Sequence, residues 1–567
     1  MSSAYIESIL NKQYLQKTFN ELASQRPRKS NAINFTYGTS GFRMDSSKLD
    51  IPLFATALIT FLRSLYCNKF IGIMITASHN PPQDNGFKTI EPKGEMLPHS
   101  WESYVTSIAN SVYENEYSKF ETNMLDIIDT IFKAYPLEKK DTSLRIILGR
   151  DTRSSSLPFA NFLNDFFTNL TTLKTENVIV LDYGIVTTPQ LHFIVRKHTA
   201  DNIFEQMDLT KEYFDAFFIP FIKLLSKVAK LQSFNTLIID CANGVGALQL
   251  EKLLPLYEKH SPQLKLELIN TNYQDCSKLN VECGADFVKT NQKLPGGISE
   301  EVANNANFLF CSLDGDADRI IFYCLTADKK FCLLDGDKMA TLIGEFFIEK
   351  LPAPLLESIK LGIVQTAYAN GSSTAYIKDV LKLDARCAKT GVKNLHHDAV
   401  ENFDVGIYFE ANGHGTVIFN DKFMQALSKY KLEEFEMFIS LINQAVGDAI
   451  TDLFIVVIIL LLLELDPRDW FKKYDDLPNT LIKCVVPDRS EFETFDYERQ
   501  LSKPIGLQEM IDEIVNETNN SDKKNRCFVR ASGTEDVVRI YCESSKQENL
   551  AIITTKVLEA IKQITNK

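Results

Sequence analysis

Three aspartates at alternate positions form the strongest chemical signal in the chain. Asp314, Asp316 and Asp318 share a short loop with Gly315, between two apolar segments. Carboxylates this close repel one another unless a cation lies between them, and Mg²⁺ accepts a few carboxylates together with phosphate or water. An EF-hand calcium loop would need a glutamate at its twelfth position, where this chain has Leu325. We therefore predict a magnesium site, with an acidic, solvated hairpin as the alternative.

A serine directly follows another apolar segment. The Ile-rich run 71–76 is typical of a buried strand, and Ser78 comes after it and before Pro81 and Pro82, which cannot continue a strand. Sites in α/β proteins gather beyond the carboxyl ends of strands. A lone serine there is usually an ordinary turn residue, and the hydrolase pattern Gly-x-Ser-x-Gly is absent from the sequence. Ser78 is a candidate nucleophile only in combination with other groups.

Two arginines flank a glycine-containing turn near the end of the chain. Guanidinium groups, hydroxyls and free backbone N–H groups together suit a phosphate dianion. With 61 basic and 74 acidic residues, the chain has a net charge of −13, so paired arginines in one loop are informative. Surface ion pairs are the alternative. The residues concerned are Arg530, Ala531, Ser532, Gly533, Thr534 and Arg539.

Weaker signals come from a second polar loop and from isolated basic residues. Glu410 and Asn412, on a loop with Ala411 and Gly413, are able to bracket vicinal hydroxyls, although such a loop is also consistent with a simple turn. Arg43 and Lys88 are able to supply positive charge beside Ser78, although lone basic residues more often lie on the surface. The adjacent pair His396-His397 favours a structural role over metal binding, because neighbouring side chains point apart.

The elements that position these residues alternate between strand-like and helix-like segments through the first three quarters of the chain. This alternation predicts an α/β fold with parallel or mixed sheets. The last hundred residues show an α+β pattern with a separate core. The most apolar run, 453–463, is shorter than the ~20 residues of a membrane span and predicts a buried helix.

Length and composition are those of a soluble multidomain protein. At about 100–200 residues per domain, 567 residues indicate three to five domains. Because acidic residues predominate, we expect neither a nucleic-acid nor a membrane partner. The 11 cysteines include no Cys-x-x-Cys pair, and no signal peptide is recognisable. We expect free, mostly buried thiols and a cytoplasmic location.

Taken together, the motifs resemble the α-D-phosphohexomutase superfamily. They are most similar to its eukaryotic phosphoacetylglucosamine mutase branch, of fungal type, and the resemblance covers nearly the whole chain. The segments that carry it are YGTSGFR at 37–43, ITASHNPPQDNGFK at 75–88, GRDTRSSS at 149–156, VTTPQLHF at 186–193, IDCANGVGA at 239–247, CGADFVKTNQ at 283–292, LDGDADR at 313–319, TGVKNLHH at 390–397, EANGHGT at 410–416 and RASGTEDVVR at 530–539.

The resemblance implies four domains around one central cleft, three mixed α/β domains and a smaller C-terminal α+β domain. The expected ranges are 1–195 with the phosphoserine loop, 196–325 with the metal loop, 326–450 with the sugar loop, and 451–567 with the phosphate loop.

It also implies roles for individual residues. Ser78 would carry the phosphoryl group and bind Mg²⁺ together with the three aspartates. Arg43 and Lys88 would assist by their charge, and either His79 or Lys88 would be the general base. Contacts to the sugar would come from Glu410, Ala411, Asn412 and Gly413, and contacts to its non-reacting phosphate from Arg530, Ala531, Ser532, Gly533, Thr534 and Arg539.

The implied reaction interconverts N-acetylglucosamine 6-phosphate and N-acetylglucosamine 1-phosphate through N-acetylglucosamine 1,6-bisphosphate, which also acts as activator. It would feed UDP-N-acetylglucosamine and hence chitin precursors. Small residues at Ala411, Gly413 and Gly415 are expected to leave space for the acetamide. We expect amino-sugar phosphates as partners and a monomer or weak homo-oligomer. The alternatives are a phosphoglucomutase or phosphomannomutase, a phosphatase, and a non-catalytic regulator that binds sugar phosphates.

Overall fold

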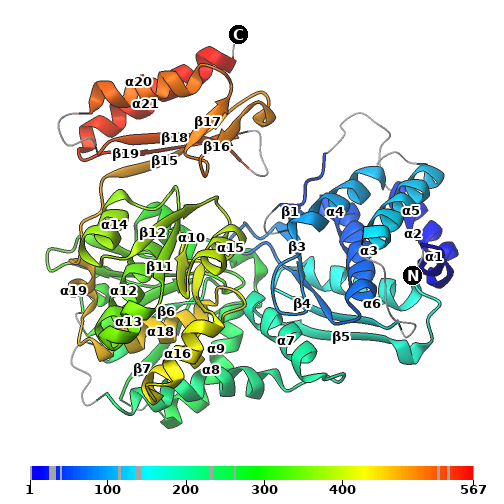
Figure 1. Cartoon of the computed structure of the whole chain (residues 1–567), viewed down its shortest axis with the longest axis horizontal. Coiled ribbons are helices and arrows are strands. Elements are labelled where there is room, and N and C mark those ends of the chain that lie inside the picture. Colours follow the sequence, from blue (N-terminus) through cyan, green and yellow to red (C-terminus); the bar gives the residue numbers. More distant parts are fainter. Residues whose placement is uncertain are drawn as a thin grey trace.

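The structure is a computed structural model, and four bodies follow one another along its chain (Figure 1). It describes residues 3–24, 34–38, 41–112, 116–134, 142–228, 234–260, 263–305, 307–519, 524–532 and 537–565. The strand expected at 71–76 is present and ends one residue earlier, and strands also flank the loop of the three aspartates on both sides, at 308–313 and 320–325. The α/β pattern with a final α+β body is confirmed.

The first body is a five-stranded mixed sheet with the order β1-β3-β2-β4-β5. Its central strand β2 is buried on both faces, which explains why it appears in the sequence as an unbroken apolar run. The strands are β1 (Phe42–Asp45), β2 (Ile71–Ile75), β3 (Asp84–Ile90), β4 (Leu144–Arg150) and β5 (Val178–Ile185). The helices are α1 (Ser3–Ile9), α2 (Lys12–Ser24), α3 (Asp50–Cys67), α4 (His99–Val112), α5 (Tyr117–Ala134), α6 (Ser156–Asn169) and α7 (Thr188–Asp201).

Helix α3 meets the length and composition test for a membrane span, and it is the one described helix that does. Its apolar side chains nevertheless pack into the core of the first body, and 83% of the 18-residue window is buried. A core helix of this kind passes the same test, because burial on nearly all sides selects the same apolar residues.

The second body is a five-stranded sheet with the order β10-β9-β8-β6-β7. β6, β7 and β8 run parallel, and the turn from β8 to antiparallel β9 carries the three aspartates. The strands are β6 (Thr236–Asp240), β7 (Lys265–Ile269), β8 (Phe308–Leu313), β9 (Ile320–Leu325) and β10 (Phe331–Leu334). The helices are α8 (Leu209–Leu225), α9 (Val245–His260), α10 (Ala285–Asn291) and α11 (Glu300–Ala303).

The third body is a four-stranded sheet with the order β12-β11-β13-β14. Its antiparallel pair, β13 and β14, is joined by the loop that contains Glu410. The strands are β11 (Leu361–Thr366), β12 (Asp384–Ala388), β13 (Val405–Phe409) and β14 (Gly415–Phe419). The helices are α12 (Gly336–Lys350), α13 (Ala353–Ser358), α14 (Gly371–Ala375), α15 (Val392–Asn402), α16 (Asp421–Ser428), α17 (Glu433–Ser440), α18 (Ala449–Leu462) and α19 (Pro467–Phe471).

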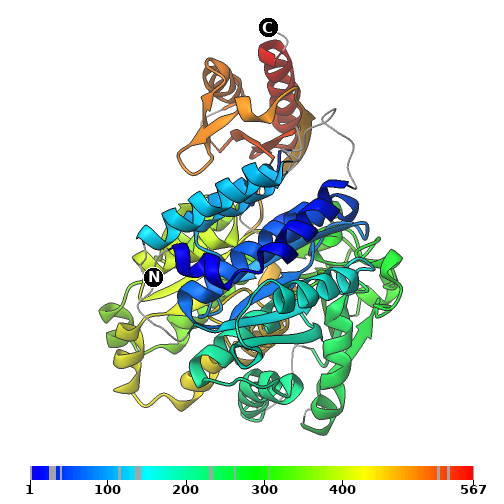
Figure 2. The ribbon, with the colours of Figure 1, turned by 90° about the vertical axis from the view of Figure 1, so that its right-hand side faces the viewer.

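The fourth body carries the antiparallel sheet β15-β19-β18 and the hairpin β16-β17. Figure 2 shows it projecting from one end of the molecule. Its apolar core is separate, whereas the second and third bodies share one core in which α18 is buried, as the sequence predicts. Its elements are β15 (Asn479–Val485), β16 (Glu493–Phe495), β17 (Gln500–Lys503), α20 (Leu507–Thr518), β18 (Arg526–Ala531), β19 (Val537–Glu543) and α21 (Gln547–Thr565).

The expected domain limits at 195, 325 and 450 stay predictions. Two elements bear on where the chain passes from one body to the next. β10 continues the second sheet beyond residue 325, and α18 lies in the core shared by the second and third bodies.

Candidate active site

The three aspartates of the β8–β9 turn converge on one point. One oxygen from each of Asp314, Asp316 and Asp318 lies within 4.8 Å of the others, and all three residues are buried. Oδ1 of Asp316 has no hydrogen-bond partner among the described residues. A buried acceptor without a partner, beside two further carboxylates, fits a hard divalent cation. This geometry agrees with the predicted magnesium site.

Ser78 lies directly against this loop. Its hydroxyl donates to Oδ2 of Asp314 at 2.6 Å and lies 3.4 Å from Oδ1 of Asp318. The residue is fully buried and has a left-handed backbone with φ of 53°, a conformation that concentrates at functional sites. A Cβ on Gly315 would stand 2.6 Å from the carbonyl oxygen of Ser78, so glycine is required for the two loops to approach this closely.

Lys88 supplies the positive charge inside the aspartate cluster. Its Nζ donates to Oδ2 of Asp316 and to Oδ2 of Asp318, both at 3.0 Å. Burial alone would disfavour the charged carboxylate, but Lys88 together with other neighbouring charges, including Arg319, outweighs it and holds the pKa of Asp318 well below its usual range. Burial, followed by the charges of Asp318 and Asp316, raises the pKa of Asp314 well above its ordinary value.

His79 and Arg43 lie at the same site, as the sequence predicts. Nδ1 of His79 is 3.5 Å from the Ser78 hydroxyl oxygen. Burial, with Arg319 and Arg43 nearby, lowers the pKa of His79 well below its ordinary value, so the ring is neutral at pH 7. Arg43 donates through Nη1 to Oδ1 of Asn80 at 3.4 Å, beside the serine loop. The catalytic roles of both residues stay predictions.

Three further residues hold the serine and metal loops in place, and the sequence analysis gave them no role. Nη2 of Arg153 donates to the carbonyl of Ser78 at 3.1 Å, and the side-chain amide of Asn280 donates to the same carbonyl at 2.9 Å. The hydroxyl of Thr188 donates to Oδ2 of Asp316 at 2.6 Å. Arg153 and Thr188 belong to the motifs at 149–156 and 186–193, so the sequence motifs pointed to these two residues. The motifs did not show which residues Arg153 and Thr188 contact.

The loop between β13 and β14 is braced from two directions. Oε1 of Glu410 accepts from the backbone N–H of Gly391 at 2.9 Å, and Oδ1 of Asn412 accepts from the N–H of His414 at 3.1 Å. The carbonyl of Gly413 accepts from the N–H of Ile320, the first residue of β9, at 3.2 Å. The sugar loop predicted from the sequence is therefore attached directly to the strand that leaves the metal loop.

The glycines of this loop have a different function from the one expected. A Cβ on Gly413 would lie 1.9 Å from the carbonyl oxygen of Ile320, and a Cβ on Gly415 would lie 2.1 Å from that of Tyr408. Both positions face protein backbone rather than open space. The expectation that these two glycines leave room for an acetamide is wrong, because they are required for close backbone packing. Ala411, in the same loop, is half-buried.

The two arginines of the fourth body form a cross-strand pair. Arg530 on β18 is in register with Arg539 on β19, so both side chains leave the same face of the sheet. Nε of Arg530 donates to the hydroxyl of Tyr368, in the third body, at 2.9 Å. Nε of Arg539 is buried and has no partner in the described part of the chain. Like charges directly opposite each other destabilise a sheet, so the pair suits an anion bound between them.

The remaining members of the predicted phosphate loop lie beside this pair. The N–H of Ser532 donates to the carbonyl of Val537 at 2.9 Å, and Ala531 continues β18. Gly533 and Thr534 lie outside the described residues, so their predicted contacts stay predictions.

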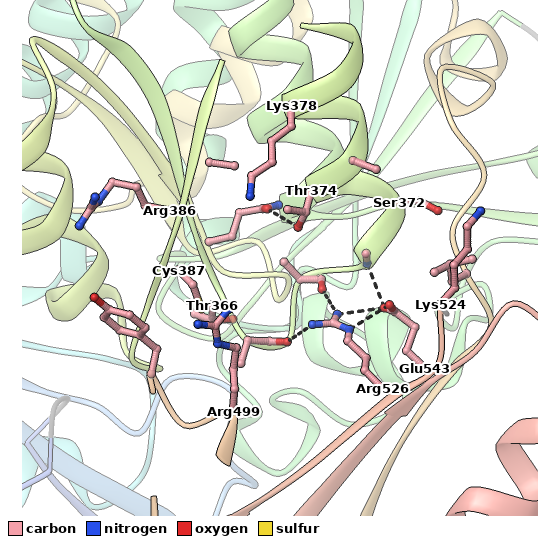
Figure 3. Close-up of a pocket in the computed structure, with 18 of the residues that line it drawn as sticks. Thr366, Ser372, Thr374, Lys378, Arg386, Cys387, Arg499, Lys524, Arg526 and Glu543 are labelled. Carbon is pink, nitrogen blue, oxygen red and sulfur yellow. Dashed lines mark hydrogen bonds and ion pairs between the residues drawn. The ribbon is translucent and has the colours of Figure 1, made fainter. Parts of the chain in front are cut away.

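A cavity of about 700 Å³ separates the third and fourth bodies (Figure 3). In it, Arg526 of the fourth body pairs with Glu543 and donates to the carbonyl of Ala367, at the end of β11. Its lining contains residues that flank Glu498 on both sides, Tyr497 and Arg499. The interface between the third and fourth bodies is therefore hollow on either side of Glu498 in the sequence.

Two secondary expectations are confirmed. His396 and His397 point to different partners, the hydroxyl of Tyr408 at 3.0 Å and a carboxylate oxygen of Glu401 at 3.2 Å, so they do not form a metal pair. All 11 cysteines are free, and eight of them are buried. Neither group contributes to the site.

The fold of four bodies and the serine that meets a three-aspartate loop define a phosphohexomutase. Family models of that kind match along the chain. Phosphoglucomutase/phosphomannomutase domain I matches residues 40–116 and the C-terminal domain matches 481–560. Phosphoacetylglucosamine mutase AMG1 domain II matches residues 205–321, and its domain III matches 335–465.

Full-length relatives give the particular family. The chain is 44% identical to phosphoacetylglucosamine mutase of Saccharomyces cerevisiae, with 94% of this chain and 96% of the relative covered. The human enzyme is 40% identical, with coverage of 94% and 95%. The chain belongs to the phosphoacetylglucosamine mutase family.

Solved structures agree with this assignment. A crystal structure of N-acetylglucosamine-phosphate mutase in its product complex superimposes with a TM-score of 0.84 at 40% identity, covering 96% of this chain and 99% of that one. A structure of the Aspergillus fumigatus N-acetylphosphoglucosamine mutase with GlcNAc-6P and magnesium has a TM-score of 0.83 at 37% identity, with coverage of 97% and 99%. Another structure of that mutase holds glucose 1,6-bisphosphate.

Proposed function

We propose that this protein interconverts N-acetylglucosamine 6-phosphate and N-acetylglucosamine 1-phosphate by passing a phosphoryl group between Ser78 and the sugar. One observation carries the proposal in this chain. The Ser78 hydroxyl is buried and donates at 2.6 Å to a carboxylate of the Asp314 loop, where a phosphoryl group on Ser78 would meet a bound cation. Membership of the family and the sugar-phosphate complexes of its relatives support the same reaction.

Asp314, Asp316, Asp318 and the phosphorylated Ser78 would hold one Mg²⁺. The ion neutralises charge on the transferring phosphoryl group when it is bound. Lys88 is already fixed by Asp316 and Asp318, which outweigh burial and raise its pKa, so it acts as a permanent cation rather than as a base. Arg43, which donates to Asn80, adds positive charge beside the serine loop.

In the first transfer, the bond between Ser78 Oγ and phosphorus breaks and a bond forms to the free hydroxyl of the sugar phosphate. The proton of that hydroxyl must go to a base. His79 suits this role, because its ring is neutral and within 3.5 Å of Ser78 Oγ. The base passes that proton to Ser78 Oγ, the oxygen that leaves. The 1,6-bisphosphate then turns round, and Ser78 Oγ attacks its other phosphoryl group. The Ser78 proton goes through the same base to the sugar oxygen that leaves, which regenerates phosphorylated Ser78 and releases the product.

Both orientations of the sugar require contacts that do not depend on which phosphate reacts. Glu410 and Asn412 would bind ring hydroxyls, and Arg530, Ser532 and Arg539 would hold the phosphate that does not react. Ala411, Gly413, Gly533 and Thr534 would complete these two loops. The alternative within the superfamily is a phosphoglucomutase or phosphomannomutase.

The proposal extends to the use of the product, the location of the enzyme and its partners. Its product would feed UDP-N-acetylglucosamine and chitin precursors in the cytoplasm, and N-acetylglucosamine 1,6-bisphosphate would be both intermediate and activator. We propose amino-sugar phosphates, rather than nucleic acid or membrane, as its partners, and a monomer or weak homo-oligomer as its state.

The test follows the purified protein by ³¹P NMR with N-acetylglucosamine 6-phosphate, Mg²⁺ and a trace of the 1,6-bisphosphate. We expect the 1-phosphate resonance to appear, and kcat/KM to be higher for N-acetylglucosamine 1-phosphate than for glucose 1-phosphate. Equal values, or a preference for glucose, would overturn the substrate assignment while leaving mutase chemistry intact. No turnover of either sugar would favour the non-catalytic regulator, and release of inorganic phosphate alone would favour a phosphatase.

A further inference from the structure

Glu498 connects the phosphate-binding strand to the third body. Its Oε1 accepts from Nη1 of Arg530 at 3.1 Å. Its Oε2 accepts from the backbone N–H of Thr390 at 2.9 Å and also from the hydroxyl of Thr390. Each oxygen of one carboxylate therefore serves a different body, and the Glu498 side chain is only 15% exposed.

The same stretch of backbone leads directly to the sugar loop. Thr390 donates its N–H to Glu498, and the next residue, Gly391, donates its N–H to Glu410 at 2.9 Å. Two successive peptide groups thus bind two carboxylates, one from the fourth body and one from the sugar loop. Glu498 and the adjacent residues Thr390 and Gly391 therefore connect Arg530 to Glu410 through consecutive hydrogen bonds.

The backbone around Glu498 is held in an unfavourable conformation. Asp496, Tyr497 and Glu498 have φ values of 49°, 57° and 69°, so three successive residues other than glycine are left-handed. This conformation is unfavourable for residues that carry a side chain, and it persists only where surrounding contacts impose it. The β16–β17 turn is therefore shaped to deliver this carboxylate.

Glu498 shares this side of the fourth body with Tyr368 of the third body, which accepts from Nε of Arg530 at 2.9 Å and packs against Phe528 and Tyr541. The fourth body has its own core, and the cavity lined by Tyr497 and Arg499 separates it from the third (Figure 3). Arg526 and Glu543, which also line that cavity, attach the fourth body to residues 367–371. Glu498 differs from these attachments because its one carboxylate joins Arg530 to the backbone beside the sugar loop.

We propose that Glu498 is a positioning residue, a latch that holds the fourth body closed on the third. In the closed state it keeps Arg530 at a fixed span from Glu410, and so retains the bisphosphate intermediate while it turns round. The inference rests on the proposed function and deepens it. A latch that opens too readily would let the bisphosphate escape, which leaves Ser78 without its phosphoryl group and the enzyme inactive until bisphosphate is supplied.

The experiment compares Glu498→Ala and Glu498→Gln with Asp496→Asn, a control in the same left-handed turn whose side chain pairs with Arg499 at the surface. For each variant we measure kcat and KM for N-acetylglucosamine 6-phosphate, and the concentration of added 1,6-bisphosphate that gives half-maximal activity. For both Glu498 variants we expect KM to rise by about 10-fold or more, and the requirement for added bisphosphate to rise by a similar factor. The control should stay within about twofold of wild type.

Each other result overturns the latch. An unchanged KM and an unchanged bisphosphate requirement would show that Glu498 does not hold the fourth body on the third. A fall in KM would show that Glu498 competes with substrate phosphate for Arg530. A rise in KM with an unchanged bisphosphate requirement would show that Glu498 contributes to binding of the substrate but not to retention of the bisphosphate.

A readout independent of activity separates this inference from the proposed function. Because the Thr390 N–H donates to Glu498, hydrogen exchange in a peptide covering residues 388–395 should be faster in Glu498→Ala than in Asp496→Asn. If the wild-type protein fails to turn over sugar phosphates, the proposed function fails, and the exchange experiment still decides whether the latch exists. Equal exchange in the two variants would overturn it.

Discussion

The hydroxyl of Ser78 is the group on which the proposed chemistry depends. Because alanine offers no atom to which a phosphoryl group can bond, we expect Ser78→Ala to lower kcat by about 10³-fold or more. The midpoint of thermal unfolding should stay close to that of wild type, since the clamp from Arg153 and Asn280 binds the backbone carbonyl of residue 78. ³¹P NMR progress curves and thermal melts check both statements. A variant that retains more than about a tenth of wild-type turnover would contradict a covalent role.

The unpartnered oxygen of Asp316 makes a second prediction at the scale of one residue. Replacing Asp316 with Asn keeps the volume but removes the charge next to Asp314 and Asp318, so we expect Mg²⁺ affinity and activity to fall together, by about 10- to 100-fold. Titration calorimetry with Mg²⁺ and assays at matched Mg²⁺ concentrations provide the measurement. Asp328→Asn, on the exposed turn after β9, is the matched control. Full wild-type activity in excess EDTA would exclude the metal assignment.

Helix α18 carries a feature that its apolar composition conceals. Asp452, in the first turn, is buried, and neither of its carboxylate oxygens has a partner among the described residues. Burial, followed by the charge of Asp448, raises the pKa of Asp452 well above its ordinary value. Folding therefore favours the protonated form, and the stability that it contributes is complete below the unfolded pKa of about 3.9 and is lost as pH rises through the folded pKa.

An uncharged side chain at position 452 of α18 should not show this loss of stability with rising pH. We expect Asp452→Asn to gain stability relative to wild type as pH rises from 5 to 8, by at most about 1.4 kcal/mol per pH unit. Thermal midpoints of both proteins across that range are the measurement, with the exposed Asp421→Asn as control. A difference in midpoint that does not change with pH would show that Asp452 titrates alike in the folded and unfolded chain.

At the scale of the whole molecule, the site depends on how separate bodies meet. Gly413, with φ of 85°, brings the sugar loop of the third body against Ile320 of the second, where a Cβ would lie 1.9 Å from a carbonyl oxygen. We expect Gly413→Ala to destabilise the protein by about 2–4 kcal/mol and to lower kcat, because the metal and sugar loops are pushed apart. Chemical denaturation and steady-state kinetics are the measurements. Gly184→Ala is the control, since its positive φ is similar but no atom lies within 4 Å of its Cβ. Equal losses in the two variants would assign the cost to backbone strain alone.

Strands and the loops that follow them could be predicted from the sequence, because they depend on interactions between residues that are close in the chain. The Ile-rich β2 is buried on both faces, and the Asp314 loop lies between two apolar strands, so the sequence pattern marks the elements and the loops that end them. The membrane-like composition of α3 was less informative, since a fully buried core helix and a membrane span select the same side chains.

The amino-acid pattern shows which chemical groups are available and in which loops they lie: Ser78 after a strand, three aspartates in one turn, and two arginines near the end. The packing of the four bodies decided how those groups meet. Ser78 and Asp314 are 236 positions apart, and Glu498 and Thr390 are 108 apart. It also decided that Gly413 serves backbone packing rather than an acetamide. Contacts of such long range depend on how whole bodies pack, which no local spacing of residues encodes.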